Sequence, residues 1–379
     1  MSVWFSASAI APQLREAWSL SASQTGWLAS AVQLGFVAGT AAAALLNLAD
    51  LVPARAYFGA SALAAAACNA ALLVAGGFGP ALGTRFGVGF FLAGVYPPAM
   101  KMIATWYKDG RGFAIGTIVG ALTVGKASPF LLHGLEHAGI APVVVLASAA
   151  SAAGGLLVLA GYRDGPFAFA RRPFAWGLVG TVLRQREVRL AIGGYLGHMW
   201  ELYAMWSWVA AFLAAGAGLA ARAADVAGFA AIAAGGAGCV VGGRLADRYG
   251  RERLTMWAMA VSGTCAVVVG PVSGSAVLAV AVALVWGFAV VADSAQFSAL
   301  VTELAPAHAV GTALTLQTSL GFLLTMASIQ LVPRLVDTVG WRWAFVALAI
   351  GPAFGIEAMG RLLRLRVSPP AAVPDPTGS

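Results

Sequence analysis

Two titratable side chains lie in the middle of an apolar stretch, in the sequence GHMWELYAMWSWV at residues 197–209. His198 and Glu201 are three residues apart, so a helix would place them on one face. Imidazole is the side chain that changes charge between pH 5 and 8, and a carboxylate beside it would titrate with it as a coupled pair. The spacing therefore predicts proton chemistry in a segment that is otherwise apolar.

Basic residues occupy similar positions in the first part of the chain. Lys126 lies about 14 residues into the apolar run 112–133, where an ammonium group costs roughly 2.5–3.5 kcal/mol unless it faces water or a partner. Arg85 and Tyr96 share one helical face in the run 81–104. We expect Lys126 to face a cavity, the alternative being a shifted span that lets it reach the membrane interface. For Arg85 the alternative is snorkelling to that interface.

Further polar residues follow in the second part of the chain. Asp293 and Gln296 share a stripe in the run 275–302, and Gln317 adds a neutral hydrogen-bonding group in a later run. With His198 and Glu201 they predict a titratable wall opposite the basic residues. The alternative is that they join helices within a packed bundle, although such contacts average well under 2 kcal/mol in membranes.

The composition decides what surrounds these residues. Of 379 residues, 60% are hydrophobic and only 10% carry charge, against roughly 25% in soluble domains. Apolar runs of about 20 residues, each long enough to cross a bilayer, recur along the chain. The sequence predicts an all-α membrane protein with twelve transmembrane helices, near 1–13, 24–47, 56–76, 81–104, 112–133, 140–161, 190–214, 223–243, 254–272, 275–302, 309–332 and 341–361.

The polar segment 162–189 divides these runs into two sets of six. We expect an N-terminal six-helix bundle at 1–161, a linker at 162–189, a C-terminal bundle at 190–365 and a disordered tail at 366–379. The octapeptides at 48–55 (LADLVPAR) and 245–252 (LADRYGRE) are 197 residues apart and support a repeat. Two pseudo-symmetric halves of this kind are a known transporter architecture.

The basic residues also predict the orientation. With both termini in the cytoplasm, cytoplasmic loops hold seventeen Lys and Arg residues and outer loops four. This positive-inside bias predicts a multi-pass protein of the plasma membrane, which in bacteria is the inner membrane. The first run is too short to cross before Gln13 and Arg15. We expect upstream residues to complete it, the alternative being a short, tilted half-helix.

The loop GGRLADRYGRERL at 242–254 resembles the loop signature of the major facilitator superfamily. The positions that match it are Gly243, Leu245, Ala246, Asp247, Arg248, Gly250 and Arg251. The resemblance implies alternating access by two rocking bundles, an Asp that caps a neighbouring helix, and arginines that latch the cytoplasmic gate. By symmetry Asp247 would face Arg111 and Gly112. Asp50 and Arg55 would hold the corresponding roles in the first copy, which is degraded at Leu46 and Leu51.

Two shorter stretches, GALTVG at 120–125 and YPPAMKM at 96–102, resemble the cyanate and nitrate or nitrite porter branches of that superfamily. The sequence therefore predicts a proton-coupled secondary active transporter for a small solute. The positive charge of Lys126 suggests that this solute is anionic. The alternatives are a proton-driven drug or metabolite efflux antiporter and a non-transporting sensor on the same scaffold. We expect no enzymatic activity, cofactor, metal or nucleic-acid partner, and a monomer whose partners are lipid, substrate and protons.

Overall fold

The computed structural model describes residues 1–46, 48–107, 111–136, 139–167 and 175–367. Helices account for nearly all of this part of the chain, and it contains no β-strand. Nine of its segments are long and apolar enough to cross a membrane. The helices Arg186–Ala211 and Arg251–Val268 are also long, and they pack among the other nine. Together with the amino-terminal segment, these form the twelve segments of the predicted all-α membrane fold.

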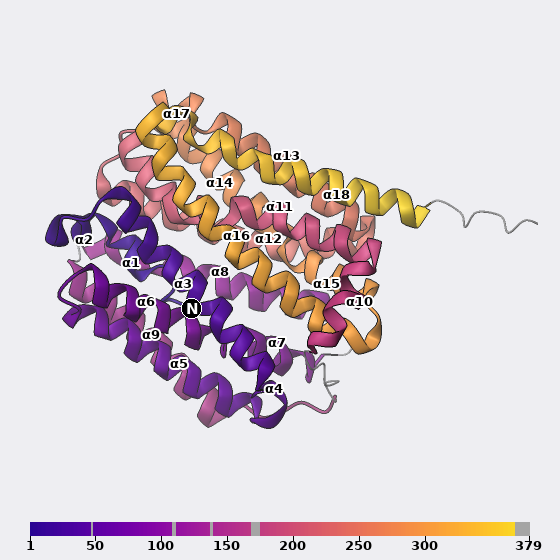
Figure 1. Cartoon of the computed structure of the whole chain (residues 1–379). Helices are drawn as coiled ribbons and strands as arrows, with labels where there is room; N and C mark the ends of the chain where they lie inside the picture. Colours follow the sequence, from indigo (N-terminus) through magenta and orange to yellow (C-terminus); the bar gives the residue numbers. More distant parts are fainter. Residues whose placement is uncertain (47, 108–110, 137–138, 168–174, 368–379) are drawn as a thin grey trace, which may run out of the picture.

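The first half of the chain supplies the helices drawn from indigo to magenta in Figure 1. They are α1 (Ser6–Ala9), α2 (Ala11–Trp18), α3 (Ala22–Leu45), α4 (Leu48–Leu51), α5 (Ala54–Ala70) with the 3-10 turn Ala71–Val74, α6 (Phe78–Leu92), α7 (Tyr96–Ala104), α8 (Arg111–Glu136) and α9 (Ile140–Gly161).

The second half supplies the helices drawn from rose to yellow. They are α10 (Val179–Arg184) after the 3-10 turn Trp176–Leu178, α11 (Arg186–Ala211) with a π turn at Phe212–Gly216, α12 (Ala221–Tyr249), α13 (Arg251–Val268), α14 (Ala276–Ala292), α15 (Ser294–Leu304), α16 (Val310–Val339), α17 (Trp341–Ala344) and α18 (Ile350–Val367). Three more 3-10 turns lie at Pro271–Gly274, Ala307–Ala309 and Phe345–Ala349.

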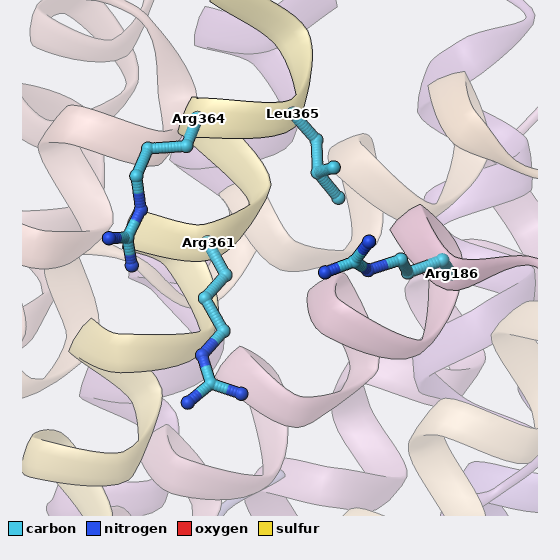
Figure 2. A pocket seen from close by; sticks show the side chains of 4 residues that line it. All are labelled: Arg186, Arg361, Arg364 and Leu365. Atoms are coloured by element: carbon cyan, nitrogen blue, oxygen red, sulfur yellow. The ribbon is translucent and has the colours of Figure 1, made fainter. Parts of the chain in front are cut away.

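The two halves lie side by side with their long helices roughly parallel (Figure 1). We call the end that carries Tyr162 and Gln185 the linker end, and the end that carries α2 and α17 the distal end. At the linker end, Arg186 begins α11 beside Arg361 and Arg364 of α18 (Figure 2).

The amino-terminal segment differs from the single helix expected at 1–13. It forms two short helices, α1 and α2, which meet at Ile10. Pro12 lies in the first turn of α2, and a proline has no backbone N–H to donate to the carbonyl four residues earlier, so a continuous helix would lose this hydrogen bond. The segment is nevertheless buried, since Val3, Phe5 and Ile10 are at most 1% exposed.

One membrane segment in each half breaks at an equivalent position. The first half breaks between α6 and α7, and α7 starts at Tyr96 with Pro97 and Pro98 in its first turn. In the second half the break falls at Asp293, and α15 starts at Ser294. Tyr96 and Ser294 are 198 residues apart, within one residue of the 197-residue spacing of the sequence repeat. Interrupted helices are tolerated at membrane depth where their backbone is buried or lines a cavity.

The halves meet along two pairs of antiparallel helices, α8 with α12 and α3 with α16. Gly120 and Gly236 bring α8 and α12 into backbone contact, because a Cβ atom at Gly120 would lie 3.0 Å from the Gly236 carbonyl oxygen. On the other pair, the rings of Phe36 and Phe322 pack with centroids 4.5 Å apart. The site described next lies between these two contact lines.

Candidate functional site

A cavity of about 90 Å³ lies between the halves. Its wall is largely aromatic and apolar, with a few polar groups contributed by both halves. The lining residues include Trp4, Phe36, Tyr96, Thr123, Lys126, Tyr195, His198, Tyr203, Trp206, Ser294, Ser298, Thr318 and Phe322. Three sequence-predicted residues, Tyr96, Lys126 and His198, therefore share one cavity.

Lys126 enters this cavity from α8 inside a cage of aromatic rings. Its side chain is 3% exposed, and its ammonium nitrogen contacts the Tyr203 hydroxyl. The same nitrogen lies 4.1 Å from the ring centroid of Trp4 and 5.3 Å from that of Trp206. Cation–π contacts of this kind contribute from about 0.5 to 2 kcal/mol each, more when water is excluded. The alternative that Lys126 reaches the membrane interface is therefore wrong.

The aromatic rings and the Tyr203 hydroxyl of the Lys126 cage contact the ammonium group but carry no opposite charge. Within the described part of the chain, no carboxylate lies within 4.0 Å of the Lys126 nitrogen. Rings and a hydroxyl can hold an ammonium group, but burial still makes its charge costly, and a bound anion would offset that cost.

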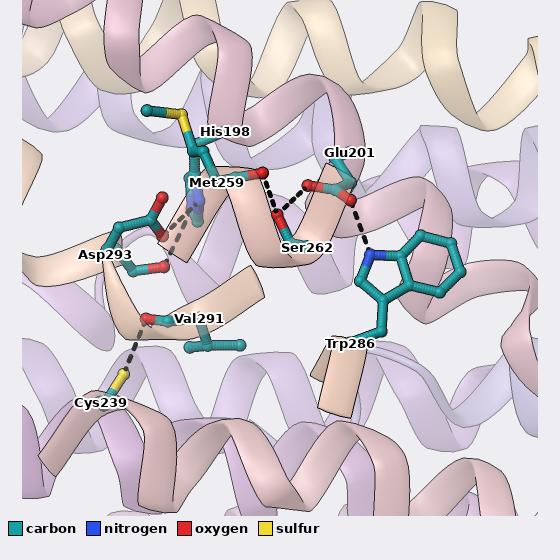
Figure 3. Close-up of polar contacts among 9 residues, drawn as sticks. His198, Glu201, Cys239, Met259, Ser262, Trp286, Val291 and Asp293 are labelled. Carbon is teal, nitrogen blue, oxygen red and sulfur yellow. Dashed lines mark hydrogen bonds and ion pairs between the residues drawn. The ribbon is translucent and has the colours of Figure 1, made fainter. Parts of the chain in front are cut away.

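On the opposite wall, His198 pairs with Asp293 and not with Glu201 (Figure 3). The Nδ1 atom of His198 lies 2.8 Å from Asp293 Oδ1, and its Nε2 atom lies 2.9 Å from Ser294 Oγ. Asp293 sits at the helix break between α14 and α15 and is 1% exposed. The expected coupled pair of His198 and Glu201 is corrected to His198 and Asp293.

Glu201 points away from the cavity into the second half (Figure 3). Its Oε2 atom accepts a 2.7 Å hydrogen bond from the Ser262 hydroxyl, and its Oε1 atom accepts one of 2.7 Å from the Trp286 indole. Residues three apart in a helix differ by about 60° in direction. This rotation is enough to send His198 to α15 and Glu201 between α13 and α14.

Arg85 is buried and does not snorkel. It is 0% exposed, and its guanidinium donates to the carbonyl of Val3 at 3.1 Å, to Ser6 Oγ at 3.1 Å and to Asn69 Oδ1 at 3.0 Å. It also contacts the carbonyl of Trp4. Arg85 therefore fixes the segment that presents the Trp4 ring to Lys126.

Gln296 and Gln317 make contacts away from the Lys126 cage. Gln296 accepts a 2.6 Å hydrogen bond from Arg251, whose Nε atom lies 2.9 Å from Glu303 Oε1. Gln317 is 0% exposed and donates to Ser298 Oγ at 3.5 Å. Gln296 thus belongs with the predicted gating loop, and Gln317 lies behind a residue of the cavity wall.

The other residues of the predicted gating loop lie at the linker end. Gly243 is buried, while Asp247 and Arg248 are exposed, and Gly250 joins α12 to α13 with a φ of 91°, which favours glycine. Arg55 is exposed at the start of α5. The side chains of Asp50 and of the first turn of α8, which Asp247 is expected to face, lie outside the described residues.

Sequence reasoning missed a polar contact between the halves at the distal end. His133 on α8 places its Nδ1 atom 2.6 Å from Asp225 Oδ2 on α12, and the amide of Gln13 contacts the other ring nitrogen. We call these three residues the distal latch. His133 shares a helical face with Lys126, but no sequence pattern pairs it with Asp225.

Two helical bundles around a central cavity are a known architecture of secondary transporters. The chain belongs to the Major Facilitator Superfamily, whose model matches residues 1–329. It is therefore a multi-pass membrane protein and a secondary transporter that works by alternating access on a small-molecule substrate. No match was found among curated proteins.

Solved structures support the same fold. The chain is similar to a bacterial homologue of the human lysosomal transporter Spinster in two inward-facing crystal structures. For the unoccupied conformation the TM-score is 0.71 at 17% identity, and for the occupied conformation it is 0.74 at 16% identity. Each comparison covers 97% of this chain and 96% of the other.

Proposed function

We propose that the protein is a proton-coupled carrier of a small organic anion. The observation that carries this proposal is the Lys126 ammonium group, which is buried in the central cavity among aromatic rings and has no carboxylate within ion-pair distance in the described chain. A bound anion would supply the missing negative charge. The surrounding rings favour an anion with an apolar or aromatic body over a fully hydrated inorganic one.

The proposal of proton coupling rests on the opposite wall. His198 and Asp293 form a buried pair at a helix break, and His198 lines the cavity that Lys126 enters from the other half. Rocking of the halves would change how far water reaches this pair. Titratable side chains buried in membrane segments commonly mark proton pathways. Glu201 is the reserve candidate, because it is buried one turn away.

The positive-inside bias would place the linker end in the cytoplasm and the distal latch outside. In this orientation the Lys126 cage and the His198–Asp293 pair would lie along one route between the two sides. The distal latch would close that route on the outer side, and the loop around Arg251 would act on the inner side. The protein is proposed to act as a monomer, because both walls of the cavity come from one chain.

The binding test is a thermal-shift screen of the purified protein. Acetate, lactate and benzoate are the anionic probes, and benzylamine and benzyl alcohol are the cationic and neutral counterparts of benzoate. We expect benzoate to raise the melting temperature of the wild type and to leave that of Lys126→Met unchanged. Two results would overturn the assignment of Lys126. One is stabilisation of the wild type by benzylamine and not by benzoate, and the other is a benzoate-induced shift in Lys126→Met as large as that in the wild type.

The coupling test uses proteoliposomes that contain a trapped pH-sensitive dye. The anionic probe that gives the largest thermal shift is added outside the vesicles. In a symporter protons should then move in the same direction as the anion, and in an antiporter they should move in the opposite direction. Asp293→Asn should abolish the proton flux and keep counterflow of the probe. Binding without counterflow in the wild type would favour the sensor alternative over a carrier.

A further inference from the structure

Three arginines line a hollow of about 270 Å³ at the linker end, outside the central cavity (Figure 2). Arg186 comes from the first residue of α11, while Arg361 and Arg364 come from the last turns of α18. Leu365 completes the lining. We call this feature the arginine hollow.

The arginine hollow contains a guanidinium group, that of Arg186, without an ion-pair partner among the described residues. Glu357 is the acidic partner on α18, with its Oε1 atom 2.6 Å from Arg361 and 3.7 Å from Arg364. Arg186 therefore brings to the hollow a guanidinium charge that no carboxylate within ion-pair distance neutralises in the described chain, and such a group suits an anionic ligand.

The exposed face of α18 places this site at a definite depth in the membrane. Ile350, Phe354, Glu357, Arg361 and Arg364 follow one another at intervals of three or four residues, so they form one stripe. Ile350 is 65% and Phe354 57% exposed, as expected of side chains that face lipid tails. Arg361 lies about 10 Å further along the helix, at seven residues of 1.5 Å each. The stripe therefore passes from hydrocarbon depth to headgroup depth at the arginines.

The helices α11 and α18, which carry the three arginines, pack closely against each other next to the hollow. A Cβ atom at Gly197 of α11 would lie 2.4 Å from the Gly351 carbonyl of α18, so the two backbones touch. One turn closer to the hollow, Gly193 packs against the Phe354 ring and Ala358. The arginines thus project from a fixed helix pair and not from a mobile loop.

We propose that the arginine hollow binds the phosphate headgroup of an anionic phospholipid in the leaflet at the linker end. Guanidinium groups bind phosphate oxygens through paired hydrogen bonds, and basic pockets beside membrane helices suit anionic headgroups. A free phosphate ion shares this chemistry. The lipid is favoured because the exposed apolar residues Ile350 and Phe354 lie further along the same stripe, beyond Glu357, and would receive the acyl chains.

The test is calorimetric titration of the full chain, purified in an uncharged detergent, with dihexanoyl-phosphatidylglycerol. Dihexanoyl-phosphatidylcholine and inorganic phosphate are the two comparison ligands. We expect the phosphatidylglycerol to bind at least about tenfold more tightly than either, because only it joins an anionic phosphate to apolar chains.

Variants then locate the binding. The triple variant R186Q/R361Q/R364Q should weaken phosphatidylglycerol binding by about tenfold or more, since each guanidinium contributes a charge-assisted contact. R186Q alone should weaken it by about threefold with an unchanged melting temperature, because Arg186 holds no described partner. The matched control R163Q/R184Q/R253Q removes the same charge from exposed positions at the same end and should stay within about twofold of the wild type.

Three results would overturn the proposal. Equal losses in the control and the test triple would show a general charge effect. Equal affinities for inorganic phosphate and phosphatidylglycerol would show a soluble-anion site. Unchanged phosphatidylglycerol binding in the test triple would place the lipid elsewhere.

Discussion

His133 and Asp225 join the two halves of the transporter at the distal end, with 2.6 Å between Nδ1 of the imidazole and Oδ2 of the carboxylate. Their side chains are only 11% and 12% exposed. A polar contact that is this well shielded from water is weakened less by solvent than one on the surface. The contact exists only while the distal ends of α8 and α12 stay together, so it favours the conformation that is closed at this end.

Replacing Asp225 should therefore shift the protein toward distal opening. Asp225→Asn keeps the size of the side chain and removes its charge, at a cost to the closed state of about 1–2 kcal/mol, or a factor of roughly 5 to 30 in the populations. Spin labels at Gly79 and Gly274 would report this, because neither position has a neighbour within 4 Å of an added Cβ atom. The distance between the two labels should show a shorter value for the closed distal end and a longer value for the open one. In Asp225→Asn the longer distance should be more populated than in the wild type.

A matched control separates this effect from a general loss of charge. Asp337 is exposed near the distal end of α16, so Asp337→Asn removes one negative charge without touching the latch. Its distance distribution should match that of the wild type. A shift of equal size in both variants would show that the His133–Asp225 contact does not control opening.

The sequence predicted the fold well because hydropathy along a chain is a local property. Eleven apolar runs correspond to long helical segments, and the run at 1–13 forms two short helices that meet at Ile10. The breaks that precede Tyr96 and Ser294 were not predicted, because each falls inside a continuous apolar run. The distance along the chain between these two positions agrees with the spacing of the octapeptide repeat to within one residue. The repeat therefore extends to the helix breaks beside the cavity.

The candidate site was only partly predictable, because partners depend on how the helices rotate against one another. The sequence predicts that Lys126 is buried and belongs to the first half, because it lies within an apolar run of that half. Its cage cannot be predicted in this way, since Trp4 and Tyr203 come from distant segments. Likewise, the shared face of His198 and Glu201 suggested one pair, whereas tertiary contacts give each its own partners.

Arg85 should affect ligand binding without touching the ligand. It donates to acceptors in three different residues and contacts a fourth, the Trp4 carbonyl, so it fixes the ring that forms one wall of the Lys126 cage. Arg85→Lys cannot reproduce this planar set of donors, and each acceptor left without a partner costs about 1–3 kcal/mol. We expect a lower melting temperature and a smaller benzoate-induced shift in the thermal assay.

The comparison for Arg85 is Arg334→Lys, an exposed arginine at the distal end. It should alter neither the melting temperature nor the benzoate response. If Arg85→Lys lowers the melting temperature but binds benzoate as the wild type does, the position of Trp4 is unimportant for the cage.

Arg251 should control the rate of cycling and not the affinity for substrate. Its guanidinium holds Gln296 and Glu303 of α15, the helix whose first residue, Ser294, contacts His198. Arg251→Ala frees the linker end of α15 while the cavity wall stays in place. Turnover in proteoliposomes should fall by about tenfold, as expected for the loss of roughly 1.4 kcal/mol from one conformational step, while thermal-shift affinity holds. A parallel loss of affinity would contradict this division of roles.

The environment of Glu201 makes one substitution unusually informative. In Glu201→Gln the amide oxygen can still accept from the Trp286 indole, and the amide nitrogen can donate to the Ser262 hydroxyl. Ser262 can then donate only to the Met259 carbonyl, which already lies 3.3 Å away. Every buried group keeps a partner, so this variant should fold and melt as the wild type does. Glu201→Ala leaves the Trp286 N–H without an acceptor and should cost about 1–3 kcal/mol.

Proton coupling can therefore be assigned to one acid or the other. Asp293 pairs with a cavity-lining histidine, whereas Glu201 is enclosed by Ser262 and Trp286, so we expect Asp293 to carry the proton during transport. Asp293→Asn should lose accumulation of the probe anion driven by an imposed pH gradient, yet keep counterflow. Glu201→Gln should retain both within about twofold, because no bond in its network depends on charge. If the losses are reversed, with Glu201→Gln uncoupled and Asp293→Asn normal, the proton passes through the network behind the cavity and the His198–Asp293 pair is structural.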